Sequence, residues 1–186
     1  MKKLATVILA AGKGKRMRNP DKSKVMFPLK GKPMIQHVVE LALKIHSEKI
    51  ILIVGHQKQT VMDFITETFK DNMDKISFAS QDEQLGTGHA VMQTKPDLEN
   101  FEGDTLILSG DVPLLRFETV DKFLNFHNAN GFSASLLSAN FDNPFGYGRI
   151  VRDNDGNFID IVEEKDADDE VKKISEINSG IYIVDN

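Results

Sequence analysis

A short apolar segment that runs directly into a glycine-rich, basic loop is the most constraining feature of this sequence. Residues 4–9 are mostly apolar or β-branched and have the length of a buried strand. The following loop carries six basic residues and one acidic residue between Lys13 and Lys24, in a chain of net charge −5. A strand that ends in such a loop predicts an open α/β sheet with an anion site at the strand's carboxyl end.

Phosphate binding is the function that this loop favours. Glycine lets the backbone come close to a ligand, and successive N–H groups form a nest for anions. Lysine and arginine side chains neutralise the phosphate charge. The alternative interpretation is a solvated surface loop, but a loop of about fifteen residues is long for a compact domain, and such loops are usually functional.

Two better-known phosphate loops are excluded by their spacing. Residues 12–17 lack the third glycine of the dinucleotide fingerprint, and the sequence contains no Gly-x-x-x-x-Gly-Lys-Ser/Thr segment. A standard NAD site and a Walker-type NTPase are therefore disfavoured, and a dehydrogenase becomes a distant alternative.

Composition narrows the class of protein further. A chain of 186 residues with 40% hydrophobic residues is long enough for one domain with a sizeable core. It contains no cysteine, which excludes disulfides, thiolate metal sites and a cysteine nucleophile. The sequence has no signal-peptide pattern and no apolar run of membrane-spanning length, so we expect a cytoplasmic protein without a membrane partner. Its negative net charge argues against a nucleic-acid partner, and nothing indicates an oligomeric state.

Apolar segments alternate between strand and helix patterns along most of the chain. We expect a doubly wound, mostly parallel, Rossmann-like sheet, because alternating strands and helices favour that fold. The loops at 10–24, 81–88 and 110–114 all follow predicted strands, so they should surround one crevice at the carboxyl edge of the sheet. Strands are predicted at 49–55, 75–80, 105–109 and 133–139, and helices at 33–47, 57–69 and 117–129.

The pattern changes beyond residue 143. Residues 148–152 and 157–163 flank Asn154-Asp155-Gly156, which predicts a β-hairpin within 148–163. The chain then ends on a predicted strand over 176–184 with no covering helix. We therefore expect residues 1–186 to form one domain that is truncated at its C-terminus.

Three side chains in the predicted loops have a chemistry that suits ligands. Asp111 follows a buried strand, where a carboxylate can hold Mg²⁺ together with substrate phosphates, although Gly-Asp is also common in ordinary turns. Gln81 and Gln84 present amides that suit the edge of a nucleobase, although glutamines in loops are more often merely solvated. No serine has a histidine and an acid at a spacing that suggests a hydrolase triad.

Six motifs occur in order along the chain and carry a family resemblance. They are LAAGKGKRM from residue 9 with Lys24, QDEQLGTGHA from 81, GDVPL from 110, GYGRI from 146, IVEEKDA from 161 and EINSGI from 176. Together they resemble the nucleotidyltransferase domain of the bacterial N-acetylglucosamine-1-phosphate uridyltransferases of the GlmU type. The first motif alone would indicate only the wider sugar-phosphate nucleotidyltransferase superfamily, and the second and sixth motifs narrow it.

The resemblance implies specific roles for residues of this chain. The substrates would be UTP and N-acetylglucosamine-1-phosphate, and the cofactor would be Mg²⁺ held by Asp111. Arg16 and Lys24 would be catalytic. Gly148, Glu163 and Asn178 would bind the amino sugar. The nucleotide would be bound by Leu9, Ala10, Ala11, Gly12, Gly14, Lys24, Gln81, Gln84, Gly86 and Thr87.

The chemistry of the implied reaction agrees with the residues present. An oxygen of the sugar-1-phosphate would attack the α-phosphorus of UTP in line, giving UDP-N-acetylglucosamine and pyrophosphate. A phosphate monoester has a second pKa of about 6, so it needs no general base at neutral pH. Positioning and charge stabilisation would do the catalytic work.

Three positions depart from the family pattern, and two other functions stay open. Lys15 stands where the family usually has threonine, Ser23 where it has proline, and Ser109 where an aromatic residue is common. The family's second metal ligand, an asparagine, lies further downstream than residue 186. The alternatives are a related nucleotidyltransferase with another base or sugar, and a non-catalytic nucleotide-sugar binding protein.

Overall fold

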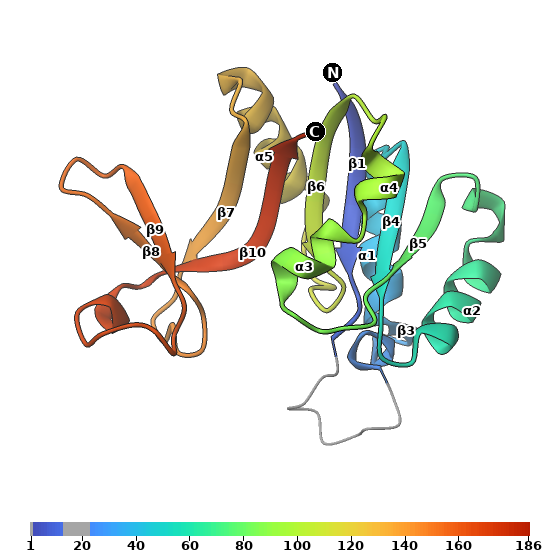
Figure 1. Cartoon of the computed structure of the whole chain (residues 1–186), viewed down its shortest axis with the longest axis horizontal. Coiled ribbons are helices and arrows are strands. Elements are labelled where there is room, and N and C mark those ends of the chain that lie inside the picture. The colour runs from blue at the N-terminus through green and yellow to red at the C-terminus, as the bar shows by residue number, and fades with distance from the viewer. Residues whose placement is uncertain (1, 13–22) are drawn as a thin grey trace. The chain divides into compact units, whose positions relative to one another are not determined.

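The chain forms two compact units, which are described separately. The computed structural model describes residues 2–12 and 23–186. The first unit comprises the described residues up to Ala134 together with 183–186, and the second unit comprises 135–182. Figure 1 traces the chain through both units.

A parallel β-sheet is the core of the first unit. Its strand order is β5-β4-β1-β6, and the central strand β1 pairs in parallel with both β4 and β6. The strands β1, β4 and β6 are almost entirely buried, as expected for a parallel sheet covered on both faces. The predicted parallel sheet is therefore confirmed, with β1 at Lys3–Leu9, β4 at Lys49–Val54, β5 at Ile76–Ser80 and β6 at Gly103–Ser109.

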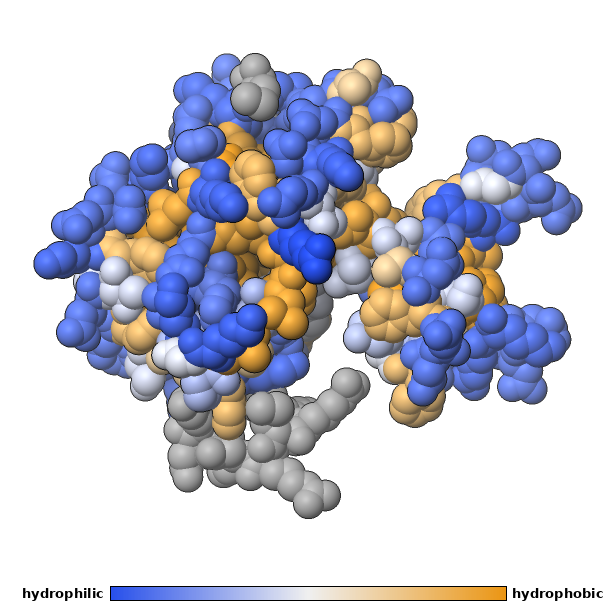
Figure 2. Space-filling view, turned by 180° about the vertical axis from the view of Figure 1, so that it is seen from behind, coloured by the Kyte–Doolittle hydropathy of each residue, from blue (hydrophilic) through white to orange (hydrophobic). Residues whose placement is uncertain are grey.

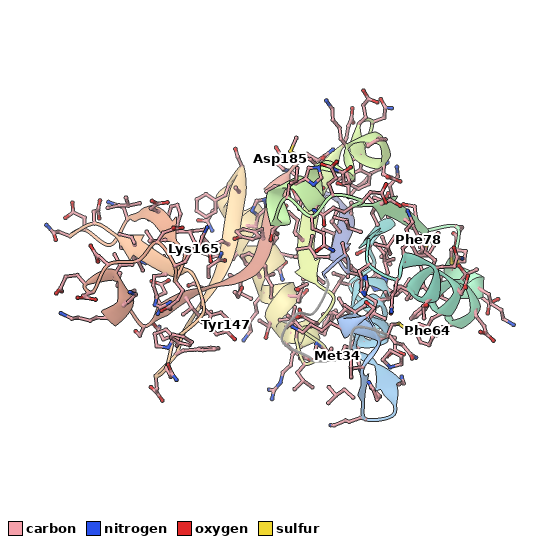
Figure 3. All side chains as sticks on the ribbon, turned by 60° about the horizontal axis from the view of Figure 1, so that its bottom comes forward. Met34, Phe64, Phe78, Tyr147, Lys165 and Asp185 are labelled. Carbon is pink, nitrogen blue, oxygen red and sulfur yellow. The ribbon has the colours of Figure 1, made fainter. Side chains whose placement is uncertain are left out.

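Helices cover both faces of this sheet. Figure 1 shows α3 and α4 in front of it and α1 and α5 behind it. Figure 3 shows Phe64 of α2 and Phe78 of β5 at the same end of the first unit. The helices are α1 at Met34–Lys44, α2 at Lys58–Thr68, α3 at Thr87–Met92, α4 at Lys95–Leu98 and α5 at Phe117–Asn130. Short 3₁₀ turns lie at Lys24–Met26 (η2), Lys70–Asn72 (η3) and Val171–Lys173 (η4), and β2 (Pro28–Leu29) pairs with β3 (Lys32–Pro33).

The end of α1 shows why helix boundaries are hard to predict. The apolar spacing, which continues to Ile45, predicts a helix over 33–47, but the helix ends at Lys44. His46 adopts a left-handed conformation with φ of 60°, and the N–H of Ser47 donates to the carbonyl oxygen of Ala42. This is the hydrogen bonding of a Schellman motif, with histidine where glycine is more usual.

The second unit is an antiparallel structure. It contains β7 (Ala134–Asn140), β8 (Arg149–Arg152), β9 (Phe158–Val162) and most of β10 (Glu176–Asp185). Strand β8 pairs antiparallel with β9 and β10, and β7 also pairs with β10. The predicted hairpin is thus confirmed.

The turn of this hairpin is held by its own side chains. Gly156 has a φ of 84°, and the Asp153 carboxylate accepts hydrogen bonds from the N–H groups of Asp155 and Asn157. Figure 3 shows Tyr147 and Lys165, which lie in loops of the same unit.

A charged contact at the start of β10 gives the second unit a dependence on pH. Arg152 donates two hydrogen bonds to the Glu176 carboxylate, both at 2.8 Å, and Ser138 donates a third. Chiefly because of the Arg152 contact, which outweighs the effect of burial, the pKa of Glu176 falls from 4.5 to about 2.

We expect Glu176→Gln to destabilise the protein at neutral pH more than in acid. Because the folded-state pKa is depressed, the contribution of Glu176 is fully present above pH 4.5 and is lost as the pH falls toward 2. Chemical unfolding of wild type and variant between pH 7 and pH 3 should show the difference in unfolding free energy shrinking on acidification. Glu170→Gln, whose partner Lys173 lies in an exposed turn, is the control. A difference that does not change with pH would contradict the prediction.

The distribution of apolar side chains determines both the character of the protein's surface and whether a helix could span a membrane. On the face shown in Figure 2, the first unit is mostly hydrophilic, with apolar side chains visible between the polar ones. In the part of the chain that the structure describes, no helix is both long enough and apolar enough to span a membrane.

Candidate active site

A cavity of about 340 Å³ lies at the carboxyl edge of the first unit's sheet. Its lining comes from the ends of β1, β5 and β6, and from η2. The prediction that the three loops surround one crevice is therefore confirmed for their described residues. The lining residues are Leu9, Ala11, Gly12, Lys24, Val25, Gln81, Gln84, Gly86, Thr87, Ala90, Ser109 and Asp111.

The end of β1 is fixed by hydrogen bonds from both neighbouring strands and from a side chain. The Gly110 N–H donates to Leu9 at 2.9 Å, and the Ala10 N–H donates to Ile53 at 2.8 Å. The Gln84 amide nitrogen donates to the carbonyl oxygen of Ala11 at 2.7 Å. These three hydrogen bonds hold the backbone at the end of β1 in place.

The predicted nucleotide-binding residues at this strand end have different positions. Leu9, Ala11 and Gly12 line the cavity, and a Cβ added to Gly12 would have no atom of the described residues within 4 Å. Ala10 is buried and does not line the cavity. Gly14 and the predicted catalytic residue Arg16 lie outside the described residues.

The loop after β5 is organised by Gln81, whose side chain is only 5% exposed. Its amide nitrogen donates to the carbonyl oxygen of Gly86 at 3.0 Å and lies 3.2 Å from Nδ1 of His89. Gly86 has a φ of 106° and precedes α3, which begins at Thr87. The Gln81 amide nitrogen thus shapes its own loop, while Gln84 is more exposed and bridges to Ala11.

Lys24, Ser109 and Asp111 form a connected group on the cavity wall. Lys24 Nζ donates to Oδ2 of Asp111, and the Ser109 hydroxyl donates to Oδ1 at 2.6 Å. Burial alone would raise the pKa of the Asp111 carboxyl, but the contacts with Lys24 and Ser109 outweigh it and hold the pKa below its ordinary value. The carboxylate is therefore ionised at neutral pH.

Asp111 suits a hard divalent cation that is mostly liganded by phosphate and water. Its side chain is 25% exposed and lies on a cavity that a ligand can enter. Among residues 2–12 and 23–186, no three histidine, aspartate or glutamate side chains are grouped so that they could hold a metal. One carboxylate with substrate phosphates is how proteins commonly bind Mg²⁺, so the donor set fits that ion.

Gly55 is a residue of this edge that the sequence analysis missed. A Cβ added to it would lie 2.9 Å from the Ala11 Cβ and 3.0 Å from the backbone oxygens of Ala11 and Gln81. Only glycine therefore lets these two loops come together. The available signal was its position at the carboxyl end of a predicted strand, as for the glycine-containing loops after the other strands.

The second unit brings together the three residues predicted to bind the sugar. The Asn178 N–H donates to the carbonyl oxygen of Gly148 at 2.8 Å. A Cβ added to Gly148 would lie 3.2 Å from Oε1 of Glu163, so the glycine makes room for that carboxylate. The side chain of Asn178 bonds to Tyr182 Oη at 2.7 Å and accepts the Gly180 N–H at 2.9 Å.

An ion pair between a buried arginine and a partly exposed glutamate supports this cluster. Arg149 is only 2% exposed and donates to Glu164 at 2.8 Å and to the carbonyl oxygen of Tyr147. Glu164 also accepts the N–H of Gly146 at 3.0 Å. These contacts fix the turn that leads into β8, so the Gly-Tyr-Gly-Arg motif is structural as well as a source of candidate ligands.

Comparisons with known proteins give a consistent result. The chain is 48% identical to the "Bifunctional protein GlmU" of Geobacter metallireducens over 179 residues, and 49% identical to that of Geotalea daltonii over 185 residues. These alignments cover 96% and 100% of the chain but only 36% and 39% of the relatives. The chain thus spans less than two fifths of the length of these relatives.

A solved structure shares the fold. A UDP-glucose pyrophosphorylase complexed with UDP-glucose superimposes with a TM-score of 0.81 at 20% identity, covering 100% of this chain and 76% of that one. The family model described as "Nucleotidyl transferase" matches residues 5–186. Because that match extends over nearly the whole sequence, the chain belongs to the nucleotidyl transferase family.

Proposed function

We propose that residues 1–186 are the nucleotidyltransferase domain of an N-acetylglucosamine-1-phosphate uridylyltransferase. It would transfer uridylyl from UTP to the sugar phosphate, releasing UDP-N-acetylglucosamine and pyrophosphate. The observation that carries the proposal is the composition of one cavity. The ion pair of Lys24 and Asp111 lines it together with Gln81, Gln84 and the glycine-containing end of β1. The high identity to relatives named GlmU supports the choice of base and sugar.

The reaction needs positioned charge rather than a proton-transfer group. The sugar phosphate is a dianion near neutral pH, so its oxygen can attack the α-phosphorus directly. Lys24 would neutralise negative charge on the triphosphate, together with Arg16 of the basic loop. Asp111 would hold Mg²⁺, which supplies Lewis-acid polarisation and charge neutralisation at the phosphates when it is bound.

Recognition of the base and sugar is assigned to neutral polar groups and one carboxylate. The exposed Gln84 amide, with Gly86 and Thr87 beside it, would hydrogen-bond uracil and ribose, and Gln81 would hold their loop in shape. In the second unit, Glu163 and Asn178 carry groups that can hydrogen-bond sugar hydroxyl and amide groups. The expectation of a cytoplasmic location stays a prediction.

A substrate grid tests this proposal. Pyrophosphate release would be measured with and without Mg²⁺, using UTP, CTP, ATP and dTTP against N-acetylglucosamine-1-phosphate and glucose-1-phosphate. The assay would use this chain, with the full-length GlmU of Geotalea daltonii as the positive control. We expect activity only with UTP, the N-acetylated sugar and Mg²⁺.

The other outcomes separate the alternatives. Activity with a different pair of substrates would keep the reaction class and overturn the substrate assignment. UTP binding by this chain without pyrophosphate release, under conditions in which the control enzyme is active, would overturn catalysis and favour a nucleotide-sugar binding protein.

A further inference from the structure

The two oxygens of the Asp111 carboxylate have different partners. The Ser109 hydroxyl donates a hydrogen bond to Oδ1 at 2.6 Å, and the Lys24 ammonium donates one to Oδ2. An ionised carboxylate can only accept hydrogen bonds, so both contacts hold the charged form. The group is therefore oriented on the cavity wall without any ligand.

The contact from Ser109 is rigid. Ser109 is the last residue of β6 and lies in register opposite Leu9, the last residue of β1, at the carboxyl edge of the sheet. Its side chain is short, so its hydroxyl can move little relative to the strand. Asp111 follows two residues later and is thus tied to the end of the strand that precedes it.

The contact from Lys24 is exchangeable. Its side chain is 40% exposed, and its ammonium is a point charge at the end of a flexible four-carbon stem. Two cations cannot occupy the same carboxylate oxygen without strong repulsion. Lys24 would therefore leave Oδ2 when Asp111 holds a divalent cation, and its ammonium would become available to the phosphates of the incoming nucleotide.

From this geometry we infer two linked roles. Ser109 is a positioning residue that orients Asp111 for the divalent cation, and Lys24 occupies Oδ2 of Asp111, the oxygen that would hold the cation, until the nucleotide arrives. Ser109 holds Oδ1 and so presents Oδ2 outward. Lys24 keeps that oxygen from binding metal in the absence of nucleotide. The inference rests on the proposed function for the identity of the nucleotide, but its contacts are independent of the base and sugar.

Metal binding to the whole protein tests the inference without measuring turnover. Mn²⁺ would be titrated by electron paramagnetic resonance, with and without UTP. We expect Ser109→Ala and Ser109→Cys to weaken Mn²⁺ binding in the presence of UTP by about tenfold or more, the usual cost of losing a partner that orients a metal ligand. Ser109→Thr, which keeps the hydroxyl, should restore it.

Lys24→Met should change Mn²⁺ binding in the opposite direction. Without nucleotide, loss of the competing ammonium should make Mn²⁺ bind more tightly than to wild type. A change that merely loosened the fold would weaken binding instead, so the sign of the effect distinguishes displacement from damage.

Ser77→Ala is the matched control. Ser77 donates to Oδ1 of Asp97 at 2.9 Å, a serine–aspartate pair of the same unit that does not line the cavity. This variant should leave Mn²⁺ binding unchanged. If Ser109→Ala and Ser109→Cys bind Mn²⁺ as wild type does, or if Ser77→Ala weakens binding equally, the positioning role is wrong.

Tighter binding is the only result for Lys24→Met that supports the displacement part, and equal or weaker binding overturns it. The outcome of the pyrophosphate-release assay is independent of the Mn²⁺ measurements. If no substrate pair gives pyrophosphate release but Mn²⁺ binding changes as expected, uridylyl transfer is rejected and the roles of Ser109 and Lys24 are kept.

Discussion

Replacing Lys24 by alanine should lower the rate of pyrophosphate release by about 10²–10³-fold, the usual cost of removing one preorganised electrostatic group from a transition state. The lysine lines the cavity, and the hydrogen bond and ion pair of its ammonium in the described structure are both with Asp111. The measurement is kcat with saturating UTP, N-acetylglucosamine-1-phosphate and Mg²⁺. Thermal unfolding should be almost unchanged, because partly exposed ion pairs contribute only about 0–1 kcal/mol.

Lys58→Ala is the control for this prediction. Lys58 is exposed to a similar extent as Lys24, 45% against 40%, and pairs with Asp82 at 3.0 Å. It begins α2 and does not line the cavity. Both variants remove one charge and one ion pair from the same unit, so only a role in the reaction can separate them. Equal activity of the two variants would reject the assignment of Lys24.

A second large effect, on KM for UTP and on stability, is expected from Gly55→Ala, although this substitution adds only one methyl group. The added Cβ would lie 2.9–3.0 Å from atoms of Ala11 and Gln81, most of them backbone, so one or both loops must move. A misplacement of about 1 Å can cost about 10²-fold in rate when it disturbs a bound geometry. We expect KM for UTP to rise by about tenfold or more, together with a loss of stability of about 1–3 kcal/mol from overpacking.

Gly103→Ala separates these two effects. Gly103 begins β6, at the opposite end of the strand from the cavity, and its added Cβ would lie 2.3 Å from the carbonyl oxygen of Lys3. This variant should lose at least as much stability as Gly55→Ala, but without a change in KM for UTP below its unfolding temperature. A normal KM in Gly55→Ala would show that the glycine serves packing alone.

The sheet and its crevice could be predicted because local patterns determine them. Continuous apolar runs such as residues 50–54 are typical of strands buried on both faces, and their alternation with helices leaves few possible topologies. The hairpin was predictable for a similar reason, since Asn154-Asp155-Gly156 suits a tight turn. The helix α4, at Lys95–Leu98, was missed because four residues carry no periodicity.

The contacts inside the candidate site could not be predicted in the same way. Nothing in the sequence near Gly55 shows that Ala11 and Gln81 approach it. The three residues come together only because β4 pairs with β1 on one side and with β5 on the other. The bond from Gln84 to Ala11 and the two contacts of Asp111 likewise depend on the assembled sheet. The residue types could suggest which side chains bind a ligand, but not which oxygen atom each side chain contacts.

The long separation between Lys24 and Asp111 has a consequence for how the protein is made. They meet although 87 positions separate them, and β1, whose end lines the same cavity, pairs with β6, which is synthesised much later. Domains generally begin to fold during synthesis, from the N-terminus. A nascent chain that has emerged only as far as β5 has the basic loop and Gln81 but no β6 and no Asp111. If the proposed function holds, tight, metal-dependent binding of UTP would begin only once β6 has docked, and a nucleotide analogue would time that step on the ribosome.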